Sequence, residues 1–523
     1  MNFYFSAAQV LDRLDAKQGS IKGLIATLPE KDRKRTSALV IETLKYKATL
    51  NDVIQEAKLL KEERKKLNSA NLALVLVHDL LLSNGGIQAG DGPIKQAVLR
   101  HKTRLKAELQ KLKIKRGVGS NTELAHLGDA RASQIPRYVR VNTLLWSMEE
   151  AVDYFVARGY MQSGPFDEES NKGFAKDEHI TNLLLFNPKV SFQDDPCYQM
   201  GKIILQDKAS CFPAAVLNPP ATLDAAVIDA TAAPGNKTSH LSALMQNKGK
   251  VVSSLPKLPI CAKSAACIQL FAFEKDKRRF STLEMMLGKA KCKNIKAVNA
   301  DFLATDPQDP ELSKVTHILL DPSCSGSGIV NRLDYLLEQG PYPSLRESFH
   351  SSPYTPPEQE SESEQEARLH KLASFQLMMI NHAMKFPNVK RIVYSTCSIH
   401  AVENEHVVSE ALKSDEATAG NFKLAPANQV LPQWPRRGLP EEMGDLTLAK
   451  CVVRCMPGDD KTNGFFVSCF IRDSEKRLDD TRKRKHDDEF EPEDGKFPDG
   501  VRKKKRKKKK KSSQVSGAGS ELV

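Results

Sequence analysis

AVIDATAAPGNKTSHL, residues 226–241, is the stretch that decides the fold this sequence predicts. Its apolar start, Ala226 to Asp229, has the composition of a buried strand, and the small residues and Gly235 after it form a turn into a helix. Backbone N–H groups of such a turn can approach a ligand closely, and the positive helix end favours a carboxylate or phosphate. A plain strand-to-helix turn has the same sequence pattern, so the function of this stretch depends on its surroundings.

Four more apolar runs follow, separated by helix-like stretches. They are LFAFE at 270–274, AVNAD at 297–301, THILLD at 316–321 and RIVYST at 391–396. Alternating strands and helices are typical of a parallel sheet built from crossover connections. We therefore expect residues 221–472 to form an α/β domain, a parallel-rich sheet with helices on both faces, with loop insertions near 252–270 and 340–366.

The remaining chain divides into three regions. Residues 1–130 show helical periodicity, and residues 131–220 mix short strand-like segments with Gly and Pro breaks, which predicts a helical domain and a small α+β module. The basic run at 100–116 either grips a phosphate backbone or forms a solvated helix face. Residues 473–523 include the lysine run 503–511 and are predicted to be a disordered basic tail.

Charge and cysteine content restrict the class of protein. The 523 residues carry 78 Lys and Arg against 65 Asp and Glu, a formal net charge of +13, which favours a polyanionic partner. Ten cysteines are too dilute for a secreted disulfide framework and predict free thiols in a reducing compartment. No apolar run reaches the about 18 residues of a membrane span, so no membrane partner is expected.

Reactive or charged residues follow the expected strands, at the edge of the sheet where ligands of open parallel sheets bind. Glu274 could accept hydrogen bonds from ribose hydroxyls, although alone it is as consistent with a solvated charge. Asp301 could receive an adenine amino group or cap a helix. Asp321 and Cys324 follow the next strand, and Cys397 follows the last.

Two cysteines at two strand ends suggest a metal site, a redox pair, or a nucleophile with a helper thiol. The CxxC spacing of zinc and redox sites is missing, which disfavours the first two. Either cysteine alone could be an ordinary buried residue. A thiolate that attacks C6 of cytosine makes C5 nucleophilic enough to accept a methyl group, and an acid such as Asp321 can bind the N3 and N4 edge.

Several motifs resemble those of the Nop/Sun-domain family of RNA cytosine-5 methyltransferases, in the family's order. The pairing of PSC with a later TCS is specific, because DNA cytosine methyltransferases place their nucleophile in the earlier motif. The N-terminal stretches 42–57 and 105–118 are further similar to the member acting on large-subunit (28S/25S) ribosomal RNA. The motifs are ILQDKASCFPAAVL (204–217), DATAAPGNKTSH (229–240), FEKDKRRF (273–280), ADF (300–302), LLDPSCSGSG (319–328), VYSTCSIHAVENE (393–405) and GFFVSCF (464–470).

The resemblance implies a Rossmann-like, S-adenosylmethionine-dependent methyltransferase that forms 5-methylcytosine in RNA without a metal. It implies that the two N-terminal domains bind RNA, that the partner is rRNA or a pre-ribosomal particle, and that the protein acts in ribosome biogenesis in the nucleus and nucleolus. Cys397 would be the nucleophile, Cys324 would assist release, and Asp321 would lie near both cofactor and cytosine. Arg140 and Lys208 would contact RNA. The implied cofactor-binding residues are Thr231, Ala232, Ala233, Pro234, Gly235, Asn236, Lys237, Glu274, Arg279, Asp301 and Asp321.

Three departures from the family pattern keep alternatives open. Glu274 stands where the family usually has Asp, Thr231 stands where Cys is common, and the insertion at 252–270 lengthens a crossover that is normally short. A noncatalytic RNA-binding ribosome-assembly factor with a disrupted cofactor site is therefore the main alternative. A DNA cytosine methyltransferase, which would use Cys324 as its nucleophile, is a third. The sequence predicts no oligomeric state.

Overall fold

A computed structural model describes residues 1–16, 18–19, 21–126, 128–167, 170–222, 225–248, 270–330, 336 and 362–473. The chain up to Asp473 forms one compact unit. The insertions predicted near 252–270 and 340–366 and the tail predicted at 473–523 lie outside the described residues, apart from residues 270, 362–366 and 473. The predicted domain boundaries at residues 130, 220 and 472 stay predictions.

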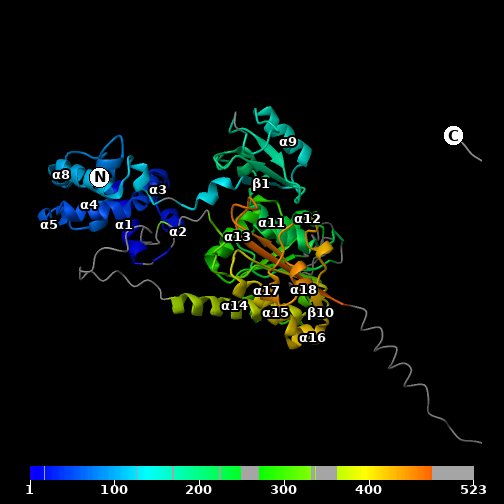
Figure 1. Cartoon of the computed structure of the whole chain (residues 1–523). Helices are drawn as coiled ribbons and strands as arrows, with labels where there is room; N and C mark the ends of the chain where they lie inside the picture. Colours follow the sequence, from blue (N-terminus) through cyan, green and yellow to red (C-terminus); the bar gives the residue numbers. More distant parts are fainter. Residues whose placement is uncertain are drawn as a thin grey trace, which may run out of the picture. The chain divides into compact units, whose positions relative to one another are not determined.

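The N-terminal part is helical, as the periodicity predicts (Figure 1). The apolar helix α6 (Ala70–Leu82) lies at its centre: residues 71–79 are all buried, and the Ser69 hydroxyl caps the helix by accepting the Leu72 N–H. The other helices of this part are α1 (Asn2–Asp15), α2 (Ile21–Ala26), α3 (Glu30–Lys45), α4 (Lys47–Glu56), α5 (Leu59–Glu62), α7 (Pro93–Arg100) and α8 (Lys102–Arg116).

Several arginines of the basic run at 100–116 are used within this helical part. Arg100 pairs with Glu63, Arg104 with Glu62 and Arg116 with Asp52. Lysines of α8 such as Lys102 and Lys106 are exposed. The run is therefore partly a set of ion pairs within the helical part and partly a solvated face.

The α+β module predicted after the helices is present as a four-stranded antiparallel sheet in the order β2-β3-β1-β4. A Ser147 and Glu150 capping box starts its helix α9, whose Phe155 packs edge-on against Phe186 of the sheet. The elements are β1 (Arg137–Val141), α9 (Met148–Ala157), β2 (Phe174–Lys176), β3 (Leu183–Phe186), α10 (Pro196–Gln199) and β4 (Ile203–Leu205).

The main sheet has the order β10-β12-β9-β8-β5-β6-β7, with β11 paired to β12. Strands β9, β8, β5, β6 and β7 run parallel, whereas β12 is antiparallel to β9 and β10 is antiparallel to β12. The strands are β5 (Val227–Asp229), β6 (Leu270–Phe273), β7 (Ile295–Val298), β8 (His317–Leu320), β9 (Arg391–Thr396), β10 (Phe422–Leu424), β11 (Val453–Cys455) and β12 (Phe465–Arg472).

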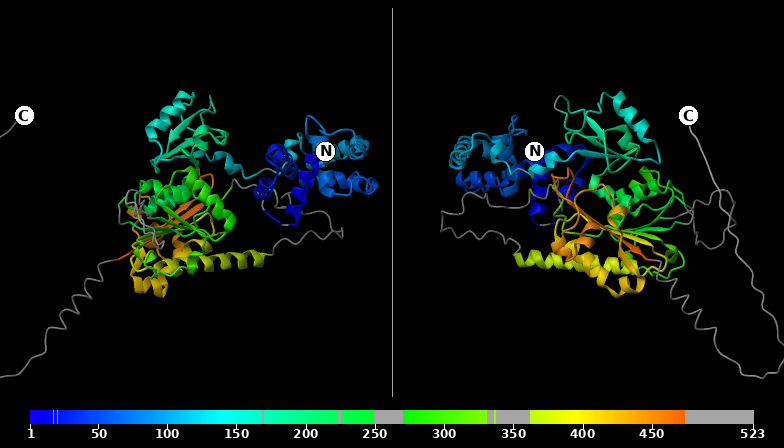
Figure 2. Two further views of the ribbon diagram at one scale, coloured as in Figure 1. Left: turned by 180° about the vertical axis from the view of Figure 1, so that it is seen from behind. Right: turned by 45° about the vertical axis from the view of Figure 1, so that its right-hand side comes forward.

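Helices cover both faces of this sheet, as predicted (Figures 1 and 2). Alternate strand residues reach opposite cores: Ile318 packs with α14 and α15, whereas Leu319 packs with α11 and α12. The helices of this domain are α11 (Lys208–Leu217), α12 (Asn236–Leu244), α13 (Lys277–Lys289), α14 (Glu362–Met384), α15 (Glu405–Lys413), α16 (Asp415–Gly420), α17 (Pro440–Met443) and α18 (Leu446–Lys450). No described helix combines the length and the apolar character needed to cross a membrane.

Two residues expected to contact RNA are instead buried between the α+β module and the main domain. Arg140 is 0% exposed and donates to Gln206 and Ser239 side chains, and Lys208 is 5% exposed and lies 2.7 Å from Asp177 Oδ2. These predictions were wrong, because both side chains are buried and hydrogen-bonded inside the protein and neither can reach a phosphate without breaking this interface; Arg140 Nη1 alone has no hydrogen-bond partner among the described residues.

Candidate functional site

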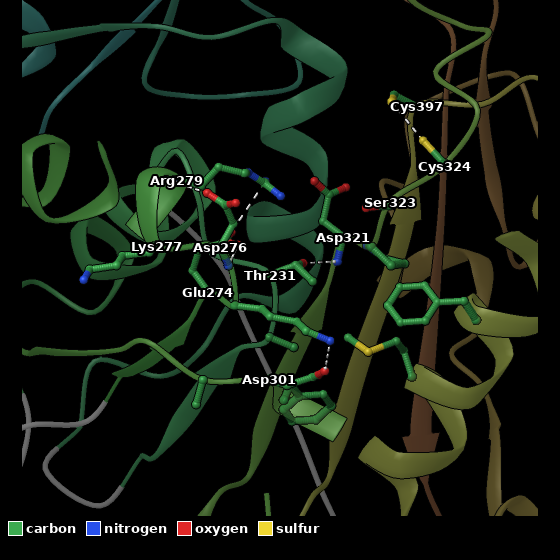
Figure 3. A pocket seen from close by; sticks show the side chains of 17 residues that line it. Thr231, Glu274, Asp276, Lys277, Arg279, Asp301, Asp321, Ser323, Cys324 and Cys397 are labelled. Atoms are coloured by element: carbon green, nitrogen blue, oxygen red, sulfur yellow. Dashed lines mark hydrogen bonds and ion pairs between the residues drawn. The ribbon is translucent and has the colours of Figure 1, made fainter. Parts of the chain in front are cut away.

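A cavity of about 740 Å³ lies at the carboxyl ends of the parallel strands (Figure 3). The chain order of the strands reverses between β5 and β8, and an open α/β sheet binds ligands at such a reversal. Seven of the predicted site residues line this one cavity although they are far apart in sequence. They are Thr231, Glu274, Arg279, Asp301, Asp321, Cys324 and Cys397.

Two carboxylates form one side of the cavity. Glu274, at the end of β6, is 5% exposed, and its Oε1 accepts the Asp276 N–H at 2.9 Å while Arg279 Nη2 lies 3.6 Å from its Oε2. Asp301 has the capping role, since its Oδ1 accepts the Leu303 N–H at the start of a turn, and its adenine role stays a prediction. Its Oδ2 accepts a 2.8 Å hydrogen bond from Lys275, which lowers the pKa of Asp301.

Asp321 is fixed where the strand order reverses. Its Oδ2 accepts a 2.8 Å hydrogen bond from Lys237, its Oδ1 accepts one of 2.7 Å from Ser395, and its N–H donates to Thr231 Oγ1. Burial alone would lower the pKa of Lys237, but the charge of Asp321 and its hydrogen bond outweigh burial and raise that pKa. Lys237 therefore stays cationic and holds Asp321 in place.

The two thiols meet above Asp321. Cys324 Sγ and Cys397 Sγ are 3.0 Å apart, and both are free cysteines. The hydrogen bond to Cys397, then burial, then the negative charges of Cys397 and Asp321 raise the pKa of Cys324 far above its usual range. The charge of Cys397 also raises the pKa of Lys237. The arrangement favours a proton on Cys324.

Close backbone packing brings the two cysteine turns together. Gly328, after Cys324, donates its N–H to the Cys397 carbonyl at 2.9 Å, and its own carbonyl accepts the Gly464 N–H at 2.7 Å. A Cβ on Gly328 would lie 2.3 Å from the Gly464 carbonyl oxygen. Glycine is therefore required here for the loop after β8 to approach β9 and β12.

Residues 232–237 do not line the cavity. They form the turn before α12 and the first two residues of that helix; Gly235 in the turn adopts a φ of +106°, and the Ala233 carbonyl accepts a 2.9 Å hydrogen bond from Arg279. Lys237 comes closest to the cavity, through Asp321. The cofactor role assigned to residues 232–237 stays a prediction.

Sequence reasoning missed part of the cavity wall. Phe302 follows Asp301 directly, so the ADF motif could have indicated it, whereas Phe375 and Met379 lie in the long helix α14 without a local signal. The remaining missed lining residues are Ala230, Lys275, Asp276, Lys277, Ala300, Pro322 and Ser323.

The residues present fit a nucleoside-containing cofactor. Glu274 and Asp301 offer acceptors for hydroxyl and amino groups, and Phe302 and Met379 offer an apolar surface beside them. Asp321 separates this part of the cavity from the thiols (Figure 3). The described residues contain no group of three or more His, Cys, Asp or Glu that could hold a metal ion.

Three segments match family descriptions. Residues 34–125 match the N-terminal domain of the NOL1/NOP2/Sun domain family member 5, and residues 135–206 match the ferredoxin-like domain of the same member. Residues 359–471 match 16S rRNA methyltransferase RsmB/F. The 25S rRNA (cytosine-C5)-methyltransferase of Schizosaccharomyces pombe is 40% identical over 468 residues, which cover 90% of this chain and 91% of that protein.

The chain belongs to the NOL1/NOP2/Sun domain family. The mouse 28S rRNA (cytosine-C5)-methyltransferase is 39% identical over 480 residues, covering 90% of this chain and 91% of that protein. The crystal structure of PH0851 has a TM-score of 0.53 at 19% identity and covers 89% of this chain and 97% of that chain, which shows the fold alone. The predicted family and the Rossmann-like methyltransferase fold are confirmed.

Proposed function

We propose that this chain is an S-adenosylmethionine-dependent methyltransferase that forms 5-methylcytosine in large-subunit ribosomal RNA. The observation that carries the proposal is the pair of thiols, Cys324 and Cys397, 3.0 Å apart beside the fixed carboxylate of Asp321. Relatives at 39% and 40% identity bear the name rRNA (cytosine-C5)-methyltransferase. Their similarity covers about nine tenths of the chain, so it includes the helical and α+β parts as well as the catalytic domain.

Cys397 begins the reaction by attacking C6 of the target cytosine. The raised pKa of Cys324 keeps the proton on that thiol, and we assign the attacking thiolate to Cys397, 3.0 Å away. Attack moves the electron pair of the C5–C6 double bond toward C5. Asp321, held by Lys237 and Ser395, accepts a hydrogen bond from the N4 amino group of the base and so selects cytosine.

Cys324 acts after methyl transfer. The adduct must lose the proton on C5; the electron pair of that C–H bond re-forms the C5–C6 double bond, the C6–S bond breaks, and Cys397 leaves as a thiolate. The pKa of Cys324 is raised chiefly by its hydrogen bond to Cys397. Once Cys397 is a thioether this largest cause disappears; Cys324 then gives its own proton to solvent, and its thiolate takes the C5 proton.

The cofactor S-adenosylmethionine supplies an electrophilic methyl group. Glu274 would hold its ribose, Asp301 its adenine beside Phe302, and Arg279 would orient Glu274. Glutamate at position 274 is compatible with this role, because the Asp276 N–H holds one carboxylate oxygen and leaves the other toward the cavity. The turn at residues 232–237 would approach the methionine part.

Covalent capture of RNA tests the proposal. Wild type, Cys324→Ala and Cys397→Ala are incubated with large-subunit ribosomal RNA and methyl-labelled cofactor, and denaturation-resistant protein–RNA adducts are measured. We expect methyl transfer by wild type, a trapped adduct in Cys324→Ala and none in Cys397→Ala. An adduct trapped by Cys397→Ala would point to the thiol order of DNA cytosine methyltransferases. Absence of cofactor binding and methyl transfer in wild type would favour a noncatalytic assembly factor.

The cellular setting follows from the same proposal. The partner is rRNA within a pre-ribosomal particle, and the site of action is the nucleolus, in agreement with the basic run at 503–511. Deletion of residues 474–523 should reduce nucleolar retention while leaving methyl transfer by the purified enzyme within about twofold of wild type, since salt-sensitive phosphate attraction contributes to binding and not to the chemical step.

A further inference from the structure

Directly after the Cys397 turn lies a buried carboxylate, Glu403, that the mechanism above does not use. Glu403 is 0% exposed and, among the described residues, forms no ion pair. Its Oε2 accepts the Ser325 hydroxyl at 2.6 Å, and its Oε1 accepts the Ser325 N–H at 2.9 Å and the Gln376 side-chain amide at 3.0 Å. A buried carboxylate is costly unless its oxygens are hydrogen-bonded, so these contacts are strongly retained.

The residues that Glu403 holds lie on both sides of Cys324. Ser325 follows Cys324 in the chain, and Gln376 also donates a 3.0 Å hydrogen bond to the carbonyl of Ser323, which precedes it. Tyr394 also holds Gln376 and Glu403 in place. Its hydroxyl lies 3.0 Å from Gln376 Oε1 and 2.5 Å from the Glu403 carbonyl oxygen. Glu403 and Gln376 therefore clamp the backbone on either side of the Cys324 thiol.

The neighbouring residue, Asn404, holds the turn that carries the other thiol, Cys397. Its side-chain oxygen accepts the Thr396 hydroxyl at 2.6 Å, and its amide donates to the Ser398 carbonyl at 3.0 Å. Thr396 and Ser398 flank Cys397. Two consecutive buried side chains thus hold two different cysteine turns, Glu403 that of Cys324 and Asn404 that of Cys397.

We propose that Glu403 is a positioning residue that acts through Cys324 in the release step, an inference that rests on the proposed function. In that step the C5 proton passes to the Cys324 thiolate, its C–H electron pair re-forms the C5–C6 double bond, and Cys397 departs as a thiolate. Attack by Cys397 does not need the Cys324 loop to be held. Loosening the Ser325 contacts therefore slows release while the covalent adduct still forms, whereas loosening the Asn404 contacts slows adduct formation.

The test compares wild type, Glu403→Ala, Glu403→Gln and Asn404→Asp in single-turnover reactions with ribosomal RNA and S-adenosylmethionine, measuring both denaturation-resistant adduct and free methylated RNA. Loss of hydrogen bonds to a charged group is worth about tenfold in rate or more, so Glu403→Ala should release product about tenfold more slowly and accumulate adduct. Glutamine can still accept the Ser325 N–H, so Glu403→Gln should restore release to within about threefold of wild type. Asn404→Asp should form adduct slowly and accumulate none.

Three outcomes would overturn the inference. Glu403→Ala could form adduct and release product both more slowly in equal proportion, Asn404→Asp could accumulate adduct like Glu403→Ala, or Glu403→Gln could be no better than Glu403→Ala. If Glu403→Ala does not fold, Ser325→Ala carries the same expectation with a smaller effect on release, because it removes the Ser325 hydroxyl contacts to Glu403, Ser327 and Ser398 but leaves the carboxylate and its bond to the Ser325 N–H in place. A failure of the proposed function itself can be told apart from these outcomes, because Cys324→Ala would then trap no adduct.

Discussion

Breaking the buried ion pair between Glu405 and Arg454 should cost more stability than any surface change. Arg454 Nε and Nη2 each lie 2.6 Å from a Glu405 oxygen, and Arg454 Nη1 donates to the Ile399 carbonyl at 3.0 Å. Glu405 is 0% exposed and Arg454 is 5% exposed. The pair therefore joins α15 to β11 and to the turn after Cys397, out of contact with water.

The variant Arg454→Met leaves the Glu405 carboxylate buried without its cation, which typically costs about 3–5 kcal/mol. The Leu439 N–H still donates to Glu405 Oε1 at 3.1 Å. We therefore expect the free energy of unfolding to fall by about 3 kcal/mol, at the lower end of that range. Adding Glu405→Gln removes the orphaned charge and should recover about 1 kcal/mol or more, because the two residues are in direct contact and their effects are not additive.

A tryptophan next to Arg454 reports this change directly. Trp434 Nε1 donates to the Arg454 carbonyl at 2.8 Å, and the chain contains two tryptophans. In a Trp146→Phe background, urea unfolding followed by fluorescence therefore measures the structure around Trp434 alone. A loss below about 1 kcal/mol in Arg454→Met, or no recovery on adding Glu405→Gln, would refute the reasoning that the pair is desolvated and coupled.

Three further variants test the site. Burial raises the pKa of Asp229 from 3.8 to about 6, so the folded state holds an extra proton between these values and its stability falls as pH rises through them. The stability of Asp229→Asn relative to wild type should therefore rise by about 2 kcal/mol from pH 4 to pH 7, and a constant difference in thermal melts would contradict this. Gly328→Ala places a methyl group 2.3 Å from the Gly464 carbonyl oxygen. It should lose about 1–3 kcal/mol in urea unfolding, and most adduct formation because the Gly328 N–H also holds the carbonyl of Cys397 itself; wild-type behaviour in both would show that the loop can shift freely. Tyr394→Phe removes the buried hydroxyl between Gln376 and Glu403 and should cost about 1–2 kcal/mol in thermal unfolding, whereas no change would mean that this hydroxyl is dispensable.

Local sequence patterns were sufficient for the strands and for the residues at their ends. The apolar run before Asp321 corresponds to β8, which ends at Leu320, and the run before Cys397 corresponds to β9. Local sequence patterns did not predict that Arg140 and Lys208 are buried inside the protein. A basic residue beside a strand has the same local sequence whether it faces a phosphate or an internal acceptor, and only the packing of the α+β module on the main domain decides between them.

Local sequence patterns also predict only part of the cavity wall. Phe302 is next to Asp301 and shares its motif, so its position follows once β7 is placed. Phe375 and Met379 are one turn apart on α14, and in the sequence they are ordinary core residues of an amphipathic helix. They line the cavity because α14 crosses the ends of β8 and β9, a tertiary arrangement that helical periodicity does not specify.

The proximity of the two thiols follows from strand adjacency. Strands β8 and β9 are parallel neighbours with Leu320 opposite Tyr394, and neighbouring strands lie about 4.8 Å apart. Cys324 and Cys397 each follow within one short turn of that register pair, so the sheet itself brings them together. In a CxxC motif one turn holds both sulfurs. Here each sulfur has its own loop and its own buried anchor, Glu403 or Asn404. Two separate supports give the two thiols different surroundings, which the proposed sequence of attack by Cys397 and release by Cys324 requires.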